Sequence, residues 1–141
     1  MQETIYHKAL EYYFKKEFEN KSLISPVMYE IINEGKKISA DEYHKNIQLQ
    51  NVLSLEINKL FLENDILFTL STTGYAPKFG IAIDPQDTCL IWTTCGLPVV
   101  NILLFNHNGM PFGLQFIGRK YQDYKLLKFI SELKSFNLIL K

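Results

Sequence analysis

The fold of this chain is decided by residues 99–117, which read VVNILLFNHNGMPFGLQFI. Two apolar runs, 99–105 and 112–117, flank a short polar segment that contains Asn108-Gly109. Because this pair tolerates positive φ angles, the stretch predicts a β-hairpin. Its first run has a polar side chain only at Asn101, so we expect a central strand that is buried on both faces. Gly113 and Gly118 allow close backbone packing in the second half of the stretch, and we expect the Gln115 amide to point at neighbouring loops.

Helical patterns stand before and after this stretch. Residues 4–18 form an amphipathic pattern, and a second helix begins with Ser25 as its N-cap and is expected to end at a left-handed Gly35. Ser39 and Glu42 have the spacing of a capping box before a long apolar stripe that runs to residue 61. Asp123 is predicted to cap a last helix.

The predicted fold class is α/β. Residues 65–70 predict a buried strand, residues 71–85 read as a loop, and residues 87–94 predict a short helix or turn. We therefore expect helices, then a small mixed sheet of one strand plus the β-hairpin, and then a C-terminal helix. The length of 141 residues suits a single domain over 1–141, with 1–62 helical and 63–141 forming the strands, the loop and the final helix.

Composition argues against two classes of partner. The chain has 15 basic and 15 acidic side chains, so it has no net charge that would attract nucleic acid or an anionic membrane surface. No apolar run is long enough for a transmembrane helix, and the N-terminal residues lack the pattern of a secretory signal. We expect a cytoplasmic protein that binds neither nucleic acid nor membrane.

The sequence offers no catalytic motif of its own. It has no G-x-S-x-G element, no metal-ligand spacing and no glycine-rich nucleotide motif, so we expect no catalytic residue, no metal and no cofactor. The histidines, His7, His44 and His107, read as solvated side chains. Cys89 and Cys95 read as small buried hydrophobes, with a disulfide or a reactive thiol as the alternative.

An ordered set of segments resembles the carboxy-terminal region of the amidase signature family. These segments are a strand with its loop at residues 65–72, Ala76-Pro77, Thr93-Thr94-Cys95-Gly96-Leu97-Pro98, the apolar run 99–105, the run Gly109-Met110-Pro111-Phe112-Gly113-Leu114-Gln115-Phe116-Ile117-Gly118, and the helix that starts at Asp123. Residues 23–43 resemble the helical stretch that precedes the strand in that family. The resemblance implies the end of an α/β/α fold.

The resemblance also implies a function. The family hydrolyses carboxamides with a Ser–cis-Ser–Lys triad in a Gly/Ser-rich signature, and these 141 residues contain no such run. The chain therefore reads as the C-terminal portion of an amidase-type hydrolase that is inactive alone. By the same resemblance, the candidate substrate-binding residues on the rim of the acyl pocket are Thr72, Thr73, Gly74, Asp87 and Trp92.

Two alternatives remain open at this stage. In the first, a separate chain carries the signature, and this chain is its partner subunit. In the second, the chain is a non-catalytic binding or scaffolding module that reuses this part of the fold. Independently of both, Trp92 can be read as a core or subunit-contact residue. The resemblance implies an N-terminal amidase half as a possible partner, and uncovered strand edges and apolar faces predict that the isolated chain self-associates.

Overall fold

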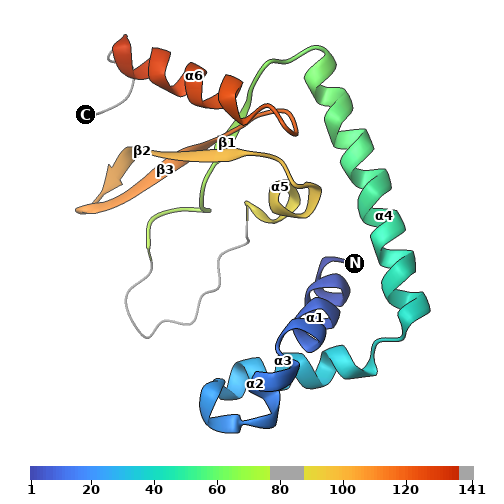
Figure 1. The fold of residues 1–141 in the computed structure, drawn as a ribbon. Coiled ribbons are helices and arrows are strands. Elements are labelled where there is room, and N and C mark those ends of the chain that lie inside the picture. The colour runs from blue at the N-terminus through green and yellow to red at the C-terminus, as the bar shows by residue number, and fades with distance from the viewer. Residues whose placement is uncertain (77–87, 137–141) are drawn as a thin grey trace. The chain divides into compact units, whose positions relative to one another are not determined.

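The chain folds into helices followed by a three-stranded sheet and a last helix (Figure 1). The computed structural model describes residues 1–76 and 88–136. In chain order the elements are α1 (Gln2–Tyr13), α2 (Lys15–Glu19), η1 (Lys21–Leu23), α3 (Pro26–Lys37), α4 (Ala40–Lys59), η2 (Leu60–Leu62), β1 (Leu67–Leu70), α5 (Leu90–Cys95), β2 (Val99–His107), β3 (Met110–Ile117) and α6 (Asp123–Ser135). The predicted fold class is confirmed.

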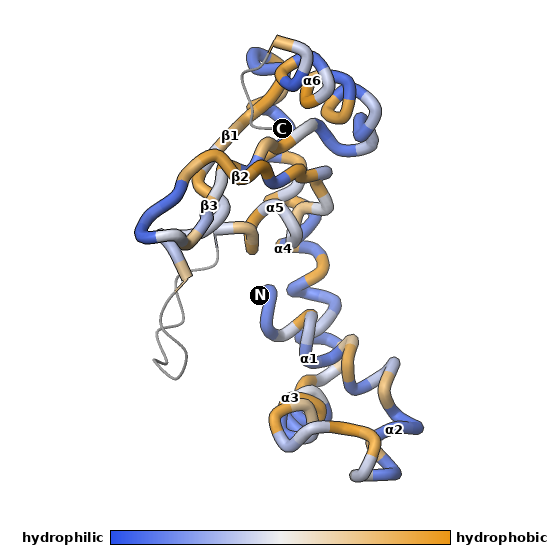
Figure 2. Tube along the Cα trace, turned by 90° about the vertical axis from the view of Figure 1, so that its left-hand side faces the viewer, coloured by the Kyte–Doolittle hydropathy of each residue, from blue (hydrophilic) through white to orange (hydrophobic). Residues whose placement is uncertain are grey.

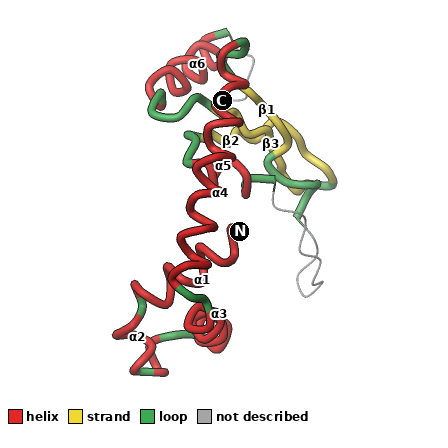
Figure 3. Tube along the Cα trace, turned by 90° about the vertical axis from the view of Figure 1, so that its right-hand side faces the viewer, coloured by secondary structure: helices red, strands yellow, loops and turns green. Residues whose placement is uncertain are grey.

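The elements form two compact units, Met1–Leu53 and Ser54–Lys141, whose boundary lies within α4. The first unit is built from helices alone (Figure 3). The second contains the sheet with α5 and α6. The single domain expected over 1–141 stays a prediction. Among the described helices, none combines the length and the hydrophobicity that a membrane span requires.

In the first unit, α1 and α3 pack closely because Gly35 has no side chain. A Cβ atom at Gly35 would collide with the main chain of His7 in α1. Ile32, nearly one turn earlier on α3, has no exposed surface. The prediction that a left-handed Gly35 ends the helix is therefore wrong. The helix α3 continues to Lys37, and Gly35 lies inside it, where it allows α1 to approach closely.

Serine side chains open two helices as the sequence predicts. Ser25 Oγ accepts a hydrogen bond of 3.2 Å from a first-turn N–H of α3, and Ser39 Oγ accepts one of 3.1 Å from the N–H of Glu42. The cap predicted at Asp123 is wrong, because Gln122 is the N-cap residue of α6 and Asp123 is its first helical residue. The Asp123 carboxylate instead stabilises the helix by lying in its first turn.

The sheet has the strand order β1-β3-β2, and both pairs are antiparallel. The prediction of a mixed sheet with residues 99–105 as its central strand is therefore wrong. β3 is the central strand among those described, because β1 pairs with the side of β3 that the hairpin leaves free. Val99, Leu103 and Phe105 of β2 remain exposed instead of buried on both faces, although much of β1 and β2 is hydrophobic (Figure 2).

The hairpin turn is confirmed. Asn108 and Gly109 have φ angles of 51° and 79°, and Asn106 Oδ1 accepts a hydrogen bond of 2.9 Å from the N–H of Gly109. Two residues with positive φ match the twist of the flanking strands. The register shifts once between Leu103 and Phe105, where the strand carries a bulge.

Helices cover opposite faces of this sheet (Figure 1). The ring of Phe116 lies 5.9 Å from that of Phe129 in α6, measured between centroids. The neighbouring Gln115 side chain bonds instead to Thr88, directly before α5. Because consecutive residues of a strand point to opposite faces, α6 and the start of α5 form the outer layers of an α/β/α arrangement.

Candidate functional site

The candidate site is organised by one polar side chain in the central strand. Gln115 has no exposed surface. Its Nε2 atom donates to the carbonyl oxygens of Leu70 at 3.2 Å and Thr88 at 2.9 Å, and its Oε1 atom accepts from Cys89 Sγ at 3.0 Å. The predicted direction of the Gln115 amide is thereby confirmed. A buried amide whose hydrogen bonds are made fixes the positions of the groups it contacts.

Ser71 ties the end of β1 into the same cluster. Its N–H and its Oγ both donate to the carbonyl oxygen of Gly113, at 2.9 Å and 2.7 Å. Its own carbonyl oxygen accepts a bond of 2.8 Å from Thr88 Oγ1. A Cβ at Gly113 would collide with main-chain atoms of Ile102, which confirms the close backbone packing predicted for this glycine. The loop after β1 and the residues before α5 are therefore held by shared hydrogen bonds.

The structure locates four of the five predicted rim residues. Thr72 and Thr73 are exposed and Gly74 is half-buried in the loop that follows Ser71. Thr72 Oγ1 donates to the Gly74 carbonyl oxygen, which folds the loop back on itself. Asp87 lies outside the described residues.

Trp92 lies in α5, one turn after the bonded Thr88. Its side chain is half-buried, and its Nε1 atom is buried with no hydrogen-bond partner among residues 1–76 and 88–136. The segment that carries Trp92 is joined to the Thr72–Gly74 loop by the hydrogen bond from Thr88 Oγ1 to the carbonyl oxygen of Ser71. An indole N–H in this state is a donor that a bound carbonyl group can satisfy.

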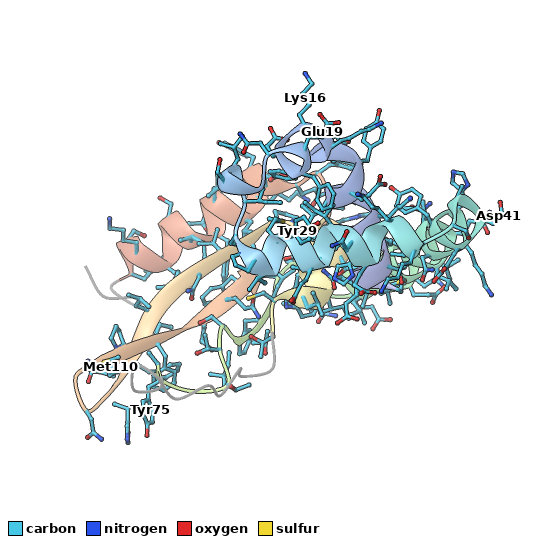
Figure 4. All side chains as sticks on the ribbon, turned by 90° about the horizontal axis from the view of Figure 1, so that it is seen from below. Lys16, Glu19, Tyr29, Asp41, Tyr75 and Met110 are labelled. Atoms are coloured by element: carbon cyan, nitrogen blue, oxygen red, sulfur yellow. The ribbon has the colours of Figure 1, made fainter. Side chains whose placement is uncertain are left out.

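The loop continues to Tyr75, whose ring stacks on His107 with 4.4 Å between centroids. His107 belongs to the last pair of the hairpin, with Met110 as its partner. Figure 4 shows Tyr75 and Met110 at the same end of the sheet. The tip of the hairpin therefore supports the loop that carries the candidate residues.

Both cysteines are free thiols. Cys95, at the end of α5, is buried, and its carbonyl oxygen accepts a bond of 3.1 Å from Ser54 Oγ. Burial raises the pKa of the Cys95 thiol, and the positive charge of Lys120 partly opposes that rise. A buried thiol with a raised pKa is poorly reactive, so the predicted role of Cys95 as a small buried hydrophobe is confirmed.

This arrangement positions loops, and among residues 1–76 and 88–136 it shows no nucleophile hydrogen-bonded to a base. The Ser71 hydroxyl donates to a backbone carbonyl oxygen, and the ring of His107 is stacked on that of Tyr75. Within the described part of the chain, no three His, Cys, Asp or Glu side chains group in a way that could hold a metal ion. Sequence reasoning missed Ser71 and Thr88, because single small polar residues in loops form no recognisable spacing. Its reading of Cys89 as a buried hydrophobe is wrong, because this thiol is half-buried and donates to Gln115.

Known proteins are similar to this chain in sequence and in fold. No protein-family model matches the sequence. A glutamyl-tRNA(Gln) amidotransferase subunit from Brevibacillus brevis is 28% identical over 97 residues, an alignment that covers 62% of this chain and 20% of that protein. The crystal structure of an amidase superposes with a TM-score of 0.78 at 22% identity, over 93% of this chain and 34% of the amidase. A bacterial aryl acylamidase of the amidase signature family gives 0.62 at 19% identity, over 86% of this chain and 29% of that one.

The chain thus has the fold of a region of an amidase signature enzyme. The predicted resemblance to the amidase signature family is confirmed by the sequence similarity and the superpositions together. The chain spans about a fifth of the curated relative and about a third of the amidase structure.

Proposed function

We propose that this chain is the carboxy-terminal portion of an amidase-type hydrolase and that it builds part of the rim of the acyl pocket. The catalytic Ser–Ser–Lys residues are supplied by another stretch of polypeptide, so the chain alone hydrolyses no amide. The observation that carries the proposal is the Gln115 cluster, which joins the loop after β1 to the start of α5. Loops at the ends of sheet strands are where α/β enzymes place binding residues.

Within that proposal, Thr72, Thr73, Gly74, Asp87 and Trp92 face the acyl part of the substrate. The Nε1 atom of Trp92, which has no partner in the described part of the chain, supports a role as a hydrogen-bond donor in the pocket. The partner is the amino-terminal half of the same fold. This chain spans about a third of the amidase, which supports a partner that supplies the remainder. The name of the Brevibacillus relative concerns glutamyl-tRNA(Gln), and we propose only that the substrate is a carboxamide.

The proposal is tested by co-expressing the chain with the portion of the Brevibacillus brevis protein that precedes its region of similarity. We expect hydrolysis of small carboxamides by the pair and none by either polypeptide alone. Trp92→Ala should lower this activity, while Asn101→Ala, which changes an exposed side chain of β2, should leave it unchanged. Amide hydrolysis by the purified 141-residue chain would sink the proposal, as would an inactive, unassociated pair.

A further inference from the structure

The free edge of β1 is the place to look for a partner. β1 pairs with β3 on one side only, and no other described strand lies on its second side. Ser71 directs its N–H to β3, and successive residues of a strand direct their backbone groups to alternate edges. Thr69 therefore faces β3, and the N–H and C=O of Phe68 face away from it. An edge of this kind is a template for another strand.

Two of the four side chains of β1 are also exposed. Phe68 is 68% exposed and Leu70 is 42% exposed, and the ring centroid of Phe68 lies 6.2 Å from that of Phe116. No Asp, Glu, Lys or Arg occurs between residues 66 and 76. Proteins that keep an edge strand unpaired protect it with charges or proline, and β1 has neither.

The position of β1 next to the candidate site favours its edge, and not the edge of β2, as the place where a partner strand binds. The loop with Thr72, Thr73 and Gly74 follows directly at the carboxyl end of β1, whereas the edge of β2 lies on the far side of β3. With neighbouring strands about 4.8 Å apart, a strand added to β1 lies next to that loop. A strand added to β2 is separated from β1 by two further strands.

Resting on the proposed function, we infer that the occupant of the β1 edge is a strand of the polypeptide that carries the catalytic signature. A second copy of this chain fits less well. β1 has four residues, about 13 Å of strand, which is too short for a symmetric β1–β1 contact to reach the roughly 800 Å² per partner of a stable interface. A partner with the remaining two thirds of the fold adds further contacts beyond the strand.

The test compares two matched substitutions on opposite edges of the sheet. Phe68→Lys places a charge on the β1 edge, and Leu103→Lys places one at the similarly exposed position of β2, where Leu103 is 55% exposed. With the co-expressed Brevibacillus polypeptide as the probe, we expect Phe68→Lys to weaken association at least roughly tenfold, as loss of a central interface residue does. Leu103→Lys should change it by less than about twofold. Leu70→Lys is a second variant on the β1 edge, and circular dichroism checks that each variant is folded.

Amide hydrogen exchange gives an independent readout. The outward N–H of Phe68 should exchange rapidly in the chain alone and slowly in the complex. An unprotected Phe68 amide in an active complex, or association that survives Phe68→Lys but is lost in Leu103→Lys, overturns the inference and leaves the proposed function intact. No association of the unmodified chain overturns both.

Discussion

The Nε2 atom of Gln115 lies 2.9 Å from the carbonyl oxygen of Thr88, so a buried side chain of the central strand holds the residue that leads into α5. The same atom donates to Leu70 at the end of β1. Gln115→Ala leaves both carbonyl oxygens without that donor inside the protein. We expect a loss of about 2–4 kcal/mol in the free energy of unfolding, measured by urea denaturation.

The control for this change stands opposite it in the sheet. Asn101 is the cross-strand partner of Gln115 on β2 and is exposed. Asn101→Ala should change the free energy of unfolding by less than about 0.5 kcal/mol. Equal effects of the two substitutions would show that the cluster around Gln115 does not hold these loops.

Gly35→Ala should reverse the usual effect of this substitution in a helix. Alanine normally stabilises a helix interior over glycine by about 0.5–1 kcal/mol. Here the new methyl group meets the His7 backbone, so α1 must move away from α3, at a cost of about 1–3 kcal/mol. Urea denaturation followed by far-ultraviolet circular dichroism measures the change.

Gly74 offers a comparison for that experiment. A Cβ at Gly74 meets no atom within 4 Å, so Gly74→Ala should leave the stability nearly unchanged. A Gly35→Ala protein that is more stable than the unmodified chain would contradict the close packing of α1 on α3.

The hairpin turn should be sensitive to a side chain at its second residue. Gly109 has a φ of 79°, a conformation that costs an alanine about 1–2 kcal/mol. We expect Gly109→Ala to lower the free energy of unfolding by about that amount. Asn108→Gly, at a φ of 51°, should be tolerated within about 0.5 kcal/mol. Amide exchange in β2 and β3 would report whether the loss is confined to the hairpin.

Alkaline pH should destabilise the protein through Cys95. Burial raises the pKa of this thiol in the folded chain, so folding favours the neutral form. The contribution to stability is complete below the pKa of the unfolded state and is lost as the pH rises through the folded-state pKa. Alkylation of Cys95 by iodoacetamide, followed by mass spectrometry, should therefore begin at a higher pH in the folded protein than in urea.

A substitution of Lys120 tests the cause of the shifted Cys95 pKa. Its charge lowers the pKa of the Cys95 thiol, so Lys120→Ala should shift the onset of alkylation to still higher pH. An onset that is the same in folded and unfolded protein would remove burial as the explanation.

Local chemistry explains which parts of the fold the sequence predicts. Asn108-Gly109 requires only its own backbone angles to form a turn, and Ser25 and Ser39 cap helices with groups in the next turn. Strand order depends on contacts between distant segments. β1 meets β3 through Leu67 and Ile117, fifty residues apart, and no local pattern marks that pairing.

The same distinction applies to the candidate site. Gln115 is predictable because a single amide interrupts an apolar strand between two glycines. Gln115 and Ser71 donate to main-chain carbonyl oxygens, which every residue has, so the pairing of Gln115 with Thr88 and of Ser71 with Gly113 carries no signal in the sequence. The roles of Thr72, Thr73, Gly74, Asp87 and Trp92 stay predictions.

The hydrogen bond from Ser54 Oγ to the carbonyl oxygen of Cys95 limits where the chain can be truncated without loss of a contact in the second unit. A deletion that started the second unit at β1 would discard Ser54 and strip the end of α5 of its donor. The shortest autonomous piece of this unit has to retain the final turns of α4, and a cloning boundary belongs ahead of Ser54.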